Sequence, residues 1–173
     1  MGIKDIIDKL LGRKKGPLIT IPELLSGLPE GYEFFSSILY DRNEIDHVVF
    51  SRRQGLFLIN SAQDKGTVSY NGTHMLINRK TRSDIIKKSL KDAFWLKSII
   101  REQIGVDVFI TPVVVFEKAK VKVTQLIIGV NVAEISGLTD IILNAPERNV
   151  LEDGVLMVLR ELHGIQTIKY RSM

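Results

Sequence analysis

The sequence predicts a mixed α/β fold, because strand-like and helix-like segments of clear character are interspersed along it. Residues 83–104 carry apolar side chains at helical spacing and precede Gly105, the expected C-cap. Residues 108–116 form a β-branched run typical of a strand buried on both faces, although Pro112 removes one ladder bond. Apolar runs bounded by turn residues predict further strands at 32–40, 45–51, 56–60, 67–70 and 73–78.

Shorter signals predict the remaining elements. Pro22 suits the first turn of a short helix over residues 21–25. Asn71-Gly72 is the strongest two-residue hairpin signal in the chain, and Ser83 or Asp84 is expected to cap the long helix. The other expected elements are a strand at 125–135 interrupted at Gly129, helices at 138–143 and 151–162, and a last strand at 166–170.

Residues 1–17 are expected to form a separate unit before a single domain that spans residues 18–173. Residues 3–11 place apolar side chains on one stripe of a short helix, and a basic linker ending at Pro17 follows. One interpretation is a helix packed on the domain. The other is a basic amphipathic helix that contacts a membrane surface or a partner.

The composition limits the classes of function. The net charge of +4 and the pI of about 9.3 suit an anionic partner. Cysteine is absent, which excludes disulfides and thiolate chemistry and favours the cytoplasm. No run is apolar enough for a transmembrane segment, and no phosphate-binding glycine motif occurs. The histidines are too scattered to predict a zinc site: His47, His74 and His163.

An ordered set of motifs from Leu28 onward resembles the nuclease-related domain (NERD) family of the PD-(D/E)XK phosphodiesterase superfamily. The most specific part is the run Ile45-Asp46-His47-Val48-Val49 followed by Gly55-Leu56-Phe57-Leu58-Ile59. The resemblance is strongest over residues 28–145. It implies a restriction-endonuclease-like core, with a central mixed sheet flanked by helices, and a role in DNA processing. The other matching pieces are 28–34, 65–66, the long helix, 112–116 and 129–132.

The resemblance also implies what the site requires. In that superfamily an aspartate on one strand and a glutamate on the next bind magnesium through oxygen ligands, and the ion activates a water. A lysine two residues after the glutamate lies on the same strand face and offsets charge in the transition state. Asp46 matches the aspartate, but Asn60 stands at the glutamate position and Ala62 at the lysine position. Asp46 and Asn60 are therefore the expected metal ligands of a degenerate motif.

Two lysines are candidates for a migrated catalytic lysine. Lys65 ends a Gln-x-Lys spacing, but an unbroken strand would point it to the face opposite Asn60 unless a bulge intervenes. Lys88 lies on the long helix near the position of a family glutamine. The helical wheel places it on the polar side, where a solvated lysine is expected.

Basic and aromatic side chains outside the motif suggest partner contacts. Arg52 and Arg53 form the turn between the two site strands and could contact phosphate or simply face solvent. Lys88, Lys91 and Trp95 share one helix face, which could stack a base, form a protein interface or be covered by a terminal helix. The expected nucleic-acid contacts are Arg52, Arg53, Lys65, Lys88 and Lys91.

Three hypotheses follow from the sequence. The first is a catalytically impaired NERD-like protein that acts as a nucleic-acid-binding or interaction module. The second is an active magnesium-dependent DNA nuclease with a rearranged site built from Asp46, Asn60 and either Lys65 or Lys88. The third is a protein-interaction or homo-oligomerisation module that uses the Trp95 face or the N-terminal helix.

Overall fold

The computed structural model describes residues 19–171 and confirms the mixed α/β fold, with four helices and a seven-stranded sheet in that range. The N-terminal helix and basic linker predicted over residues 1–17 lie outside the described residues. In chain order the elements are α2 (Ile21–Ser26), β1 (Tyr32–Tyr40), β2 (Asn43–Ser51), β3 (Gly55–Tyr70), β4 (Met75–Ile77), β5 (Lys80–Thr81), α3 (Ser83–Ile104), β6 (Ile110–Val121), β7 (Asn131–Glu134), α4 (Ile135–Leu143) and α5 (Asp153–Arg171).

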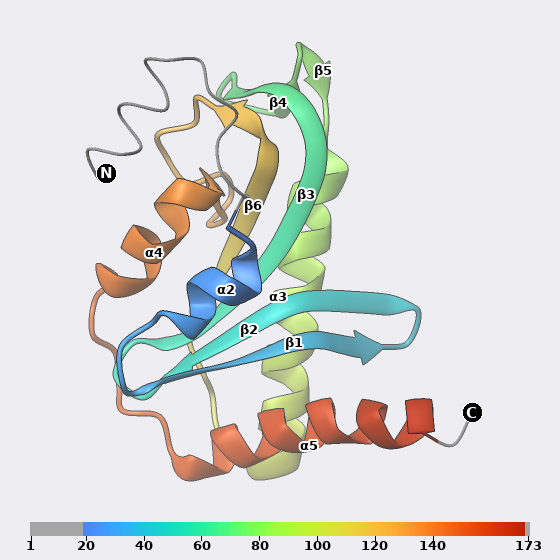
Figure 1. The fold of residues 1–173 in the computed structure, drawn as a ribbon, viewed down its shortest axis with the longest axis vertical. Coiled ribbons are helices and arrows are strands. Elements are labelled where there is room, and N and C mark those ends of the chain that lie inside the picture. Colours follow the sequence, from blue (N-terminus) through green and yellow to red (C-terminus); the bar gives the residue numbers. More distant parts are fainter. Residues whose placement is uncertain (1–18, 172–173) are drawn as a thin grey trace.

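The sheet combines an antiparallel meander with parallel strands (Figure 1). Short turns join β1, β2 and β3, which pair antiparallel in that order. The chain then passes through β4, β5 and the long helix α3, and this crossover lets β6 pair parallel with β3. Strand β7 pairs parallel with β6, and β4 extends the other side of β3. The long strand β3 is therefore the centre of the sheet.

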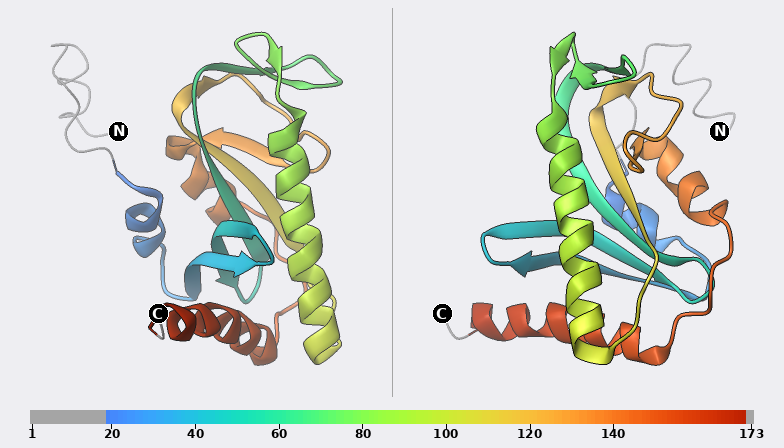
Figure 2. Two further views of the ribbon diagram at one scale, coloured as in Figure 1. Left: turned by 90° about the vertical axis from the view of Figure 1, so that its right-hand side faces the viewer. Right: turned by 180° about the vertical axis from the view of Figure 1, so that it is seen from behind.

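Helices cover the two faces of the sheet (Figures 1 and 2). Helix α3 runs along one face, α2 and α4 lie against the other, and α5 packs across β1 at one end. Three apolar clusters fill the spaces between these layers. One of them joins the start of α3 to β3, β4 and β6, and it includes Ala62, Ile86 and Phe116.

Several predicted boundaries agree with the structure. The short helix with Pro22 in its first turn, the strand over residues 32–40 and the turn at 52–54 are confirmed. Helix α3 spans residues 83–104 and ends at Gly105, which adopts the left-handed conformation with φ of 67°. By contrast, the strand predicted at 125–135 is much shorter than expected, because β7 spans only Asn131–Glu134 and residues 125–130 form a turn with one isolated bridge.

Other predictions were wrong in their details. A four-residue loop replaces the two-residue turn at Asn71-Gly72, since the Asn71 carboxamide accepts bonds from the backbone of Thr73 and His74. Helix α3 has Arg82 at its N-cap and no side-chain cap bond, so neither Ser83 nor Asp84 caps it.

Further strand predictions also need correction. The runs predicted as separate strands at 56–60 and 67–70 belong to one strand, β3. The β-branched strand begins at Ile110, two residues later than predicted, and continues to Val121. The strand predicted at 166–170 is wrong, because α5 continues through Arg171. A short apolar run alone cannot distinguish a strand from the end of a helix. No helix in the described part of the chain is both long and apolar enough to cross a membrane.

Candidate active site

The predicted site residues of β2 and β3 meet at one cavity. The last pair of the β2–β3 ladder joins His47 to Ile59, and Asp46 and Asn60 are the next residues on the two strands. Both line a cavity of about 420 Å³, together with Ala62 on β3 and Lys88 on α3. The other lining residues are Arg42, Asn43, Glu44, Ser61, Gln63, Asp64, Asp84, Ile85 and Val114.

Asp46 holds the neighbouring strand. Its Oδ2 accepts a hydrogen bond from the backbone nitrogen of Ser61 at 2.8 Å and lies 3.4 Å from the Ser61 hydroxyl. The backbone N–H would otherwise lose its partner where the ladder ends. Asp46 therefore has a structural role that does not depend on an ion.

Asn60 is almost fully buried, with 6% of its surface exposed. Its Nδ2 donates to Oδ2 of Asp92 at 3.2 Å. Its Oδ1 is buried and finds no hydrogen-bond partner within the described residues. An unsatisfied buried acceptor of this kind costs about 1–3 kcal/mol. The neutral amide at this position therefore donates to the carboxylate of Asp92, and its own Oδ1 has no partner among the described residues.

Asp92 is the central residue that sequence reasoning missed. Its side chain is 0% exposed and accepts from three groups: the Tyr40 hydroxyl at Oδ1, and Lys88 Nζ (2.6 Å) and Asn60 Nδ2 at Oδ2. Burial, followed by the hydrogen bond to Asp92, raises the pKa of Tyr40 far above its usual value, so this hydroxyl stays protonated and donates.

A signal for Asp92 was present in the sequence. The buried positions of α3 recur at steps of three and four residues, and Asp92 lies on that stripe between Ser89 and Leu96. A carboxylate on an otherwise apolar stripe needs buried donors. The buried residues of α3 are Ile86, Ser89, Asp92, Leu96 and Ile100.

Lys88 is held at the cavity rather than freely solvated, which corrects the prediction for it. Its Nζ donates to Asp92 and, at 2.8 Å, to the backbone oxygen of Glu44. The side chain is 45% exposed. Two of its three N–H donors are thus engaged by the protein, and the ion pair with Asp92 offsets the charge that the lysine brings.

Lys65 does not reach the cavity. The register between β3 and β6 shifts by one residue between Ala62 and Lys65, which is the irregularity that a migrated lysine would need. However, Lys65 is exposed and absent from the cavity lining, where Gln63 and Asp64 lie instead. The bulge therefore does not bring Lys65 beside Asp46.

Acidic groups predominate around the cavity. Two of its carboxylates, Asp64 and Asp84, pair with Arg82 at the start of α3, and this guanidinium lowers the pKa of Asp84. The cavity lining itself provides two cations, Arg42 and Lys88. It provides four carboxylates, on Glu44, Asp46, Asp64 and Asp84.

The donor set fits the magnesium implied by the family poorly. No group of three or more acidic, histidine or cysteine side chains within residues 19–171 is arranged to hold a metal ion. Asp46 is engaged by Ser61, and Asn60 contributes no charge. The unpaired Oδ1 of Asn60 is the one atom here that a cation would satisfy, and a single orphan atom does not make a magnesium site.

His47 points away from this cavity, as its alternation with Asp46 predicts. It is buried, and its Nδ1 lies 2.8 Å from the hydroxyl of Ser36 on β1. Burial lowers the pKa of His47, although Asp46 and Glu44 act in the opposite direction. His47 is therefore a packed residue and not a group of the cavity.

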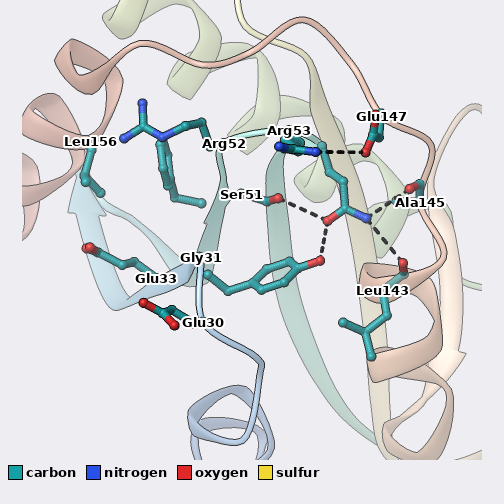
Figure 3. Close-up of a pocket in the computed structure, with 13 residues that line it drawn as sticks. Glu30, Gly31, Glu33, Ser51, Arg52, Arg53, Leu143, Ala145, Glu147 and Leu156 are labelled. Atoms are coloured by element: carbon teal, nitrogen blue, oxygen red, sulfur yellow. Dashed lines mark hydrogen bonds and ion pairs between the residues drawn. The ribbon is translucent and has the colours of Figure 1, made fainter.

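Arg52 and Arg53 lie at the opposite end of the β2–β3 hairpin, beside a larger cavity of about 830 Å³ (Figure 3). Arg52 donates to the backbone oxygen of Leu151 at 3.1 Å and pairs with Asp153 at 2.5 Å. Arg53 points toward Glu147 at 3.8 Å. Both arginines therefore bind the segment that leads into α5, and the fold does not bring them to Asp46.

Gln54 is the centre of this second region. Its Nε2 donates to the backbone oxygens of Ile142 and Ala145, both at 3.0 Å. Its Oε1 accepts from the hydroxyls of Tyr32 at 2.6 Å and Ser51 at 3.1 Å. The side chain thereby satisfies carbonyls at the end of α4, where a helix leaves them without partners.

Trp95 is not the exposed aromatic residue of α3. It is partly buried and stacks on Tyr40, with ring centroids 4.1 Å apart. Tyr40 on β1 therefore covers one face of the Trp95 ring, whereas the sequence suggested cover by a terminal helix. Phe94, its neighbour in sequence, is 75% exposed, while Lys91 is exposed.

Comparison with known proteins agrees with the geometry. The family model that describes the nuclease-related domain matches residues 14–117, which is more than half of the chain. No curated protein and no solved structure gives a match. The order of strands around β3, with Asp46 and Asn60 at one cavity, is consistent with this family assignment. The chain belongs to the nuclease-related domain (NERD) family and so to the PD-(D/E)XK superfamily.

Proposed function

We propose that this NERD domain has lost metal-dependent phosphodiester hydrolysis and acts as a nucleic-acid-binding module. The observation that carries the proposal is the way positions 60 and 62 are built into the packing. Asn60 donates to the buried carboxylate of Asp92, and Ala62 lies in the apolar cluster beneath α3. The two groups that the chemistry requires are thus replaced by residues with other roles.

The environment of Asn60 opposes a return to glutamate. A carboxylate at position 60 would face Asp92, whose Oδ2 lies 3.2 Å from the present amide nitrogen. Two carboxylates that share a dry site cannot both stay ionised without a cost in free energy. Asp92 and Asn60 are therefore mutually compatible, and they form a stable alternative to the metal-binding pair.

An active nuclease with a rearranged site is the second candidate, and one observation favours it. Lys88 lines the same cavity as Asp46. Its ammonium is nevertheless bound by Asp92 and Glu44, and removing one member of a cooperating catalytic set already lowers rates by orders of magnitude. The single lysine does not replace both missing groups.

Fluorescence anisotropy with labelled single- and double-stranded oligonucleotides tests the binding role. We expect binding that weakens with salt, as counterion release requires. Asp46→Asn should bind with the same affinity as the wild type, since Asp46 supports β3 and is not expected to touch phosphate. An absence of binding at low salt would contradict the proposal and leave the protein-interaction hypothesis. The cytoplasmic location that the cysteine-free sequence favours is compatible with either role.

A further inference from the structure

Three lysines form a row at the end of β6, where Lys118 and Lys120 lie in the strand and Lys122 directly follows it. Lys118, Lys120 and Lys122 are exposed and alternate with Ala119, Val121 and Val123. The alternating apolar residues belong to the cluster beneath α3. Because successive side chains of a strand point to opposite faces, the three lysines share one side of this segment and the three apolar residues share the other.

A fourth lysine extends the row onto the neighbouring strand. Lys65 on β3 pairs in register with Lys118, so their side chains lie next to each other on one face of the sheet. Like charges at such positions are destabilising. Within residues 19–171 none of the four lysines makes an ion pair, and the preceding carboxylate of β6, Glu117, is bonded by Gln63. We call Lys65, Lys118, Lys120 and Lys122 the lysine ladder.

Two further cations flank the lysine ladder. Asn78 is fixed to β3, since its Oδ1 accepts from the backbone nitrogen of Thr67 at 3.0 Å and its Nδ2 donates to the backbone oxygen of Lys65 at 3.4 Å. The exposed residues Arg79 and Lys80 follow directly. Figure 1 shows the ends of β3 and β6 together with β4 and β5 at the end of the molecule far from α5.

The fit to a polyanion follows from charge and shape. Lysines at alternate positions of a strand are about 6.7 Å apart, so the row presents evenly spaced point charges. Such a row suits a repeating phosphate backbone and offers nothing to read base edges. The cavity at Asp46, by contrast, is lined by four carboxylates and two cations, which repels a polyanion.

We propose that the lysine ladder binds the phosphodiester backbone of a nucleic acid, on a surface separate from the remnant of the active site. This inference rests on the proposed function, because it names the surface through which the module binds. The competing explanation is protection of an edge. Strand β7 ends at Glu134, beside Phe116, so the second half of β6 has no β7 partner, and lysines discourage pairing with another chain at such an edge.

A triple variant tests the proposal: Lys118→Gln, Lys120→Gln and Lys122→Gln. The slope of log K against log salt for a labelled duplex should fall in magnitude by about 2.7, because each phosphate that is no longer neutralised lowers it by about 0.9. With a single strand the slope should fall by about 2.1, because each phosphate then accounts for about 0.7. Circular dichroism verifies the fold. A companion variant with arginine at the same three positions should keep the wild-type slope.

The matched control removes the same charge from exposed positions of α3, with Lys87→Gln, Lys91→Gln and Lys97→Gln. It should leave most of the slope intact. If the control lowers the slope and the β6 variant does not, the lysine ladder is overturned while the binding role stands. If the wild type binds neither nucleic acid, the binding role and the ladder both fail. Self-association of the folded β6 variant with an unchanged slope overturns the ladder in favour of edge protection.

Discussion

The two ends of the β2–β3 hairpin carry polar clusters of different completeness. At the Arg52–Arg53 end, Gln54 uses both its amide and its carbonyl, and each finds two close partners. At the Asp46 end, Asp92 is fully partnered, but Asn60 keeps a buried oxygen without one among the described residues. The two central side chains are similarly buried, with 7% of Gln54 and 6% of Asn60 exposed, so their own exposure does not explain the difference.

Under the proposed function, the difference separates a structural cluster from the remnant of a functional one. Natural proteins satisfy almost all buried polar atoms, and exceptions tend to occur where a site once had, or still has, another requirement. Gln54 donates to backbone oxygens at the end of α4, and its own amide and carbonyl are both hydrogen-bonded. Asn60 stands where the resemblance to the family implies a glutamate, and its neutral amide donates to Asp92.

The largest expected effect is at Asp92. Asp92→Ala removes a buried carboxylate and leaves the Tyr40 hydroxyl and the Asn60 amide without their acceptor. We expect the free energy of unfolding to fall by about 3 kcal/mol, as when one partner of a buried polar network is removed. Urea titration measures this. A loss below about 0.5 kcal/mol would show that the hydrogen bonds of Asp92 do not stabilise the fold.

Gln54→Ala should have a somewhat smaller effect. It removes the donor to Ile142 and Ala145 and the acceptor of the Tyr32 hydroxyl, at a cost of about 2 kcal/mol. Water can reach part of this region and replace some of the missing bonds. Amide hydrogen exchange should show faster exchange at the end of α4 than at α3. Uniform acceleration across both helices would contradict a local role for Gln54.

The titration of His47, which neighbours Asp46 on β2, gives a test by pH of how this side chain is packed. Burial lowers its pKa from 6.5, so below that pH the unfolded chain binds more protons than the folded one. Stability should therefore rise with pH through the window below 6.5. We expect wild-type protein to lose more stability than His47→Gln between about pH 7.5 and about pH 5.5. Equal losses would mean that His47 titrates normally in the folded state.

The smallest expected effect is at Arg53. Its partner Glu147 is 3.8 Å away, and the two side chains are 76% and 75% exposed. An exposed pair of this kind contributes within about 0.5 kcal/mol. Arg53→Ala should leave the midpoint of urea unfolding unchanged within error. A larger shift would show that Arg53 in the hairpin turn, and not only Gln54, stabilises the packing of this turn against the segment before α5.

The sequence was sufficient for features that depend on local chemistry. The bounds of β1, the turn at residues 52–54 and the left-handed Gly105 follow from nearby residues. The proximity of Asp46 and Asn60 was also predictable, because two consecutive strands joined by a short turn must bring their ends together.

The features that could not be predicted depend on distant partners. Asp92 on α3 is hydrogen-bonded to Tyr40 on β1 and to Asn60 on β3. Its third partner, Lys88, lies one turn away on the same helix. The pairing of Lys65 with Lys118 requires the register of a parallel pair across a helical crossover. Alternation in β6 could have indicated the exposed lysines, but not the strand that lies beside them.

Cleavage of DNA by wild-type protein and by Asp46→Asn, in magnesium or manganese, tests the central claim most directly. We predict that the two proteins release product at the same background rate from supercoiled plasmid and from single strands, because positions 60 and 62 no longer support hydrolysis. Metal-dependent cleavage by the wild type that Asp46→Asn abolishes would contradict this claim and establish an active, rearranged site.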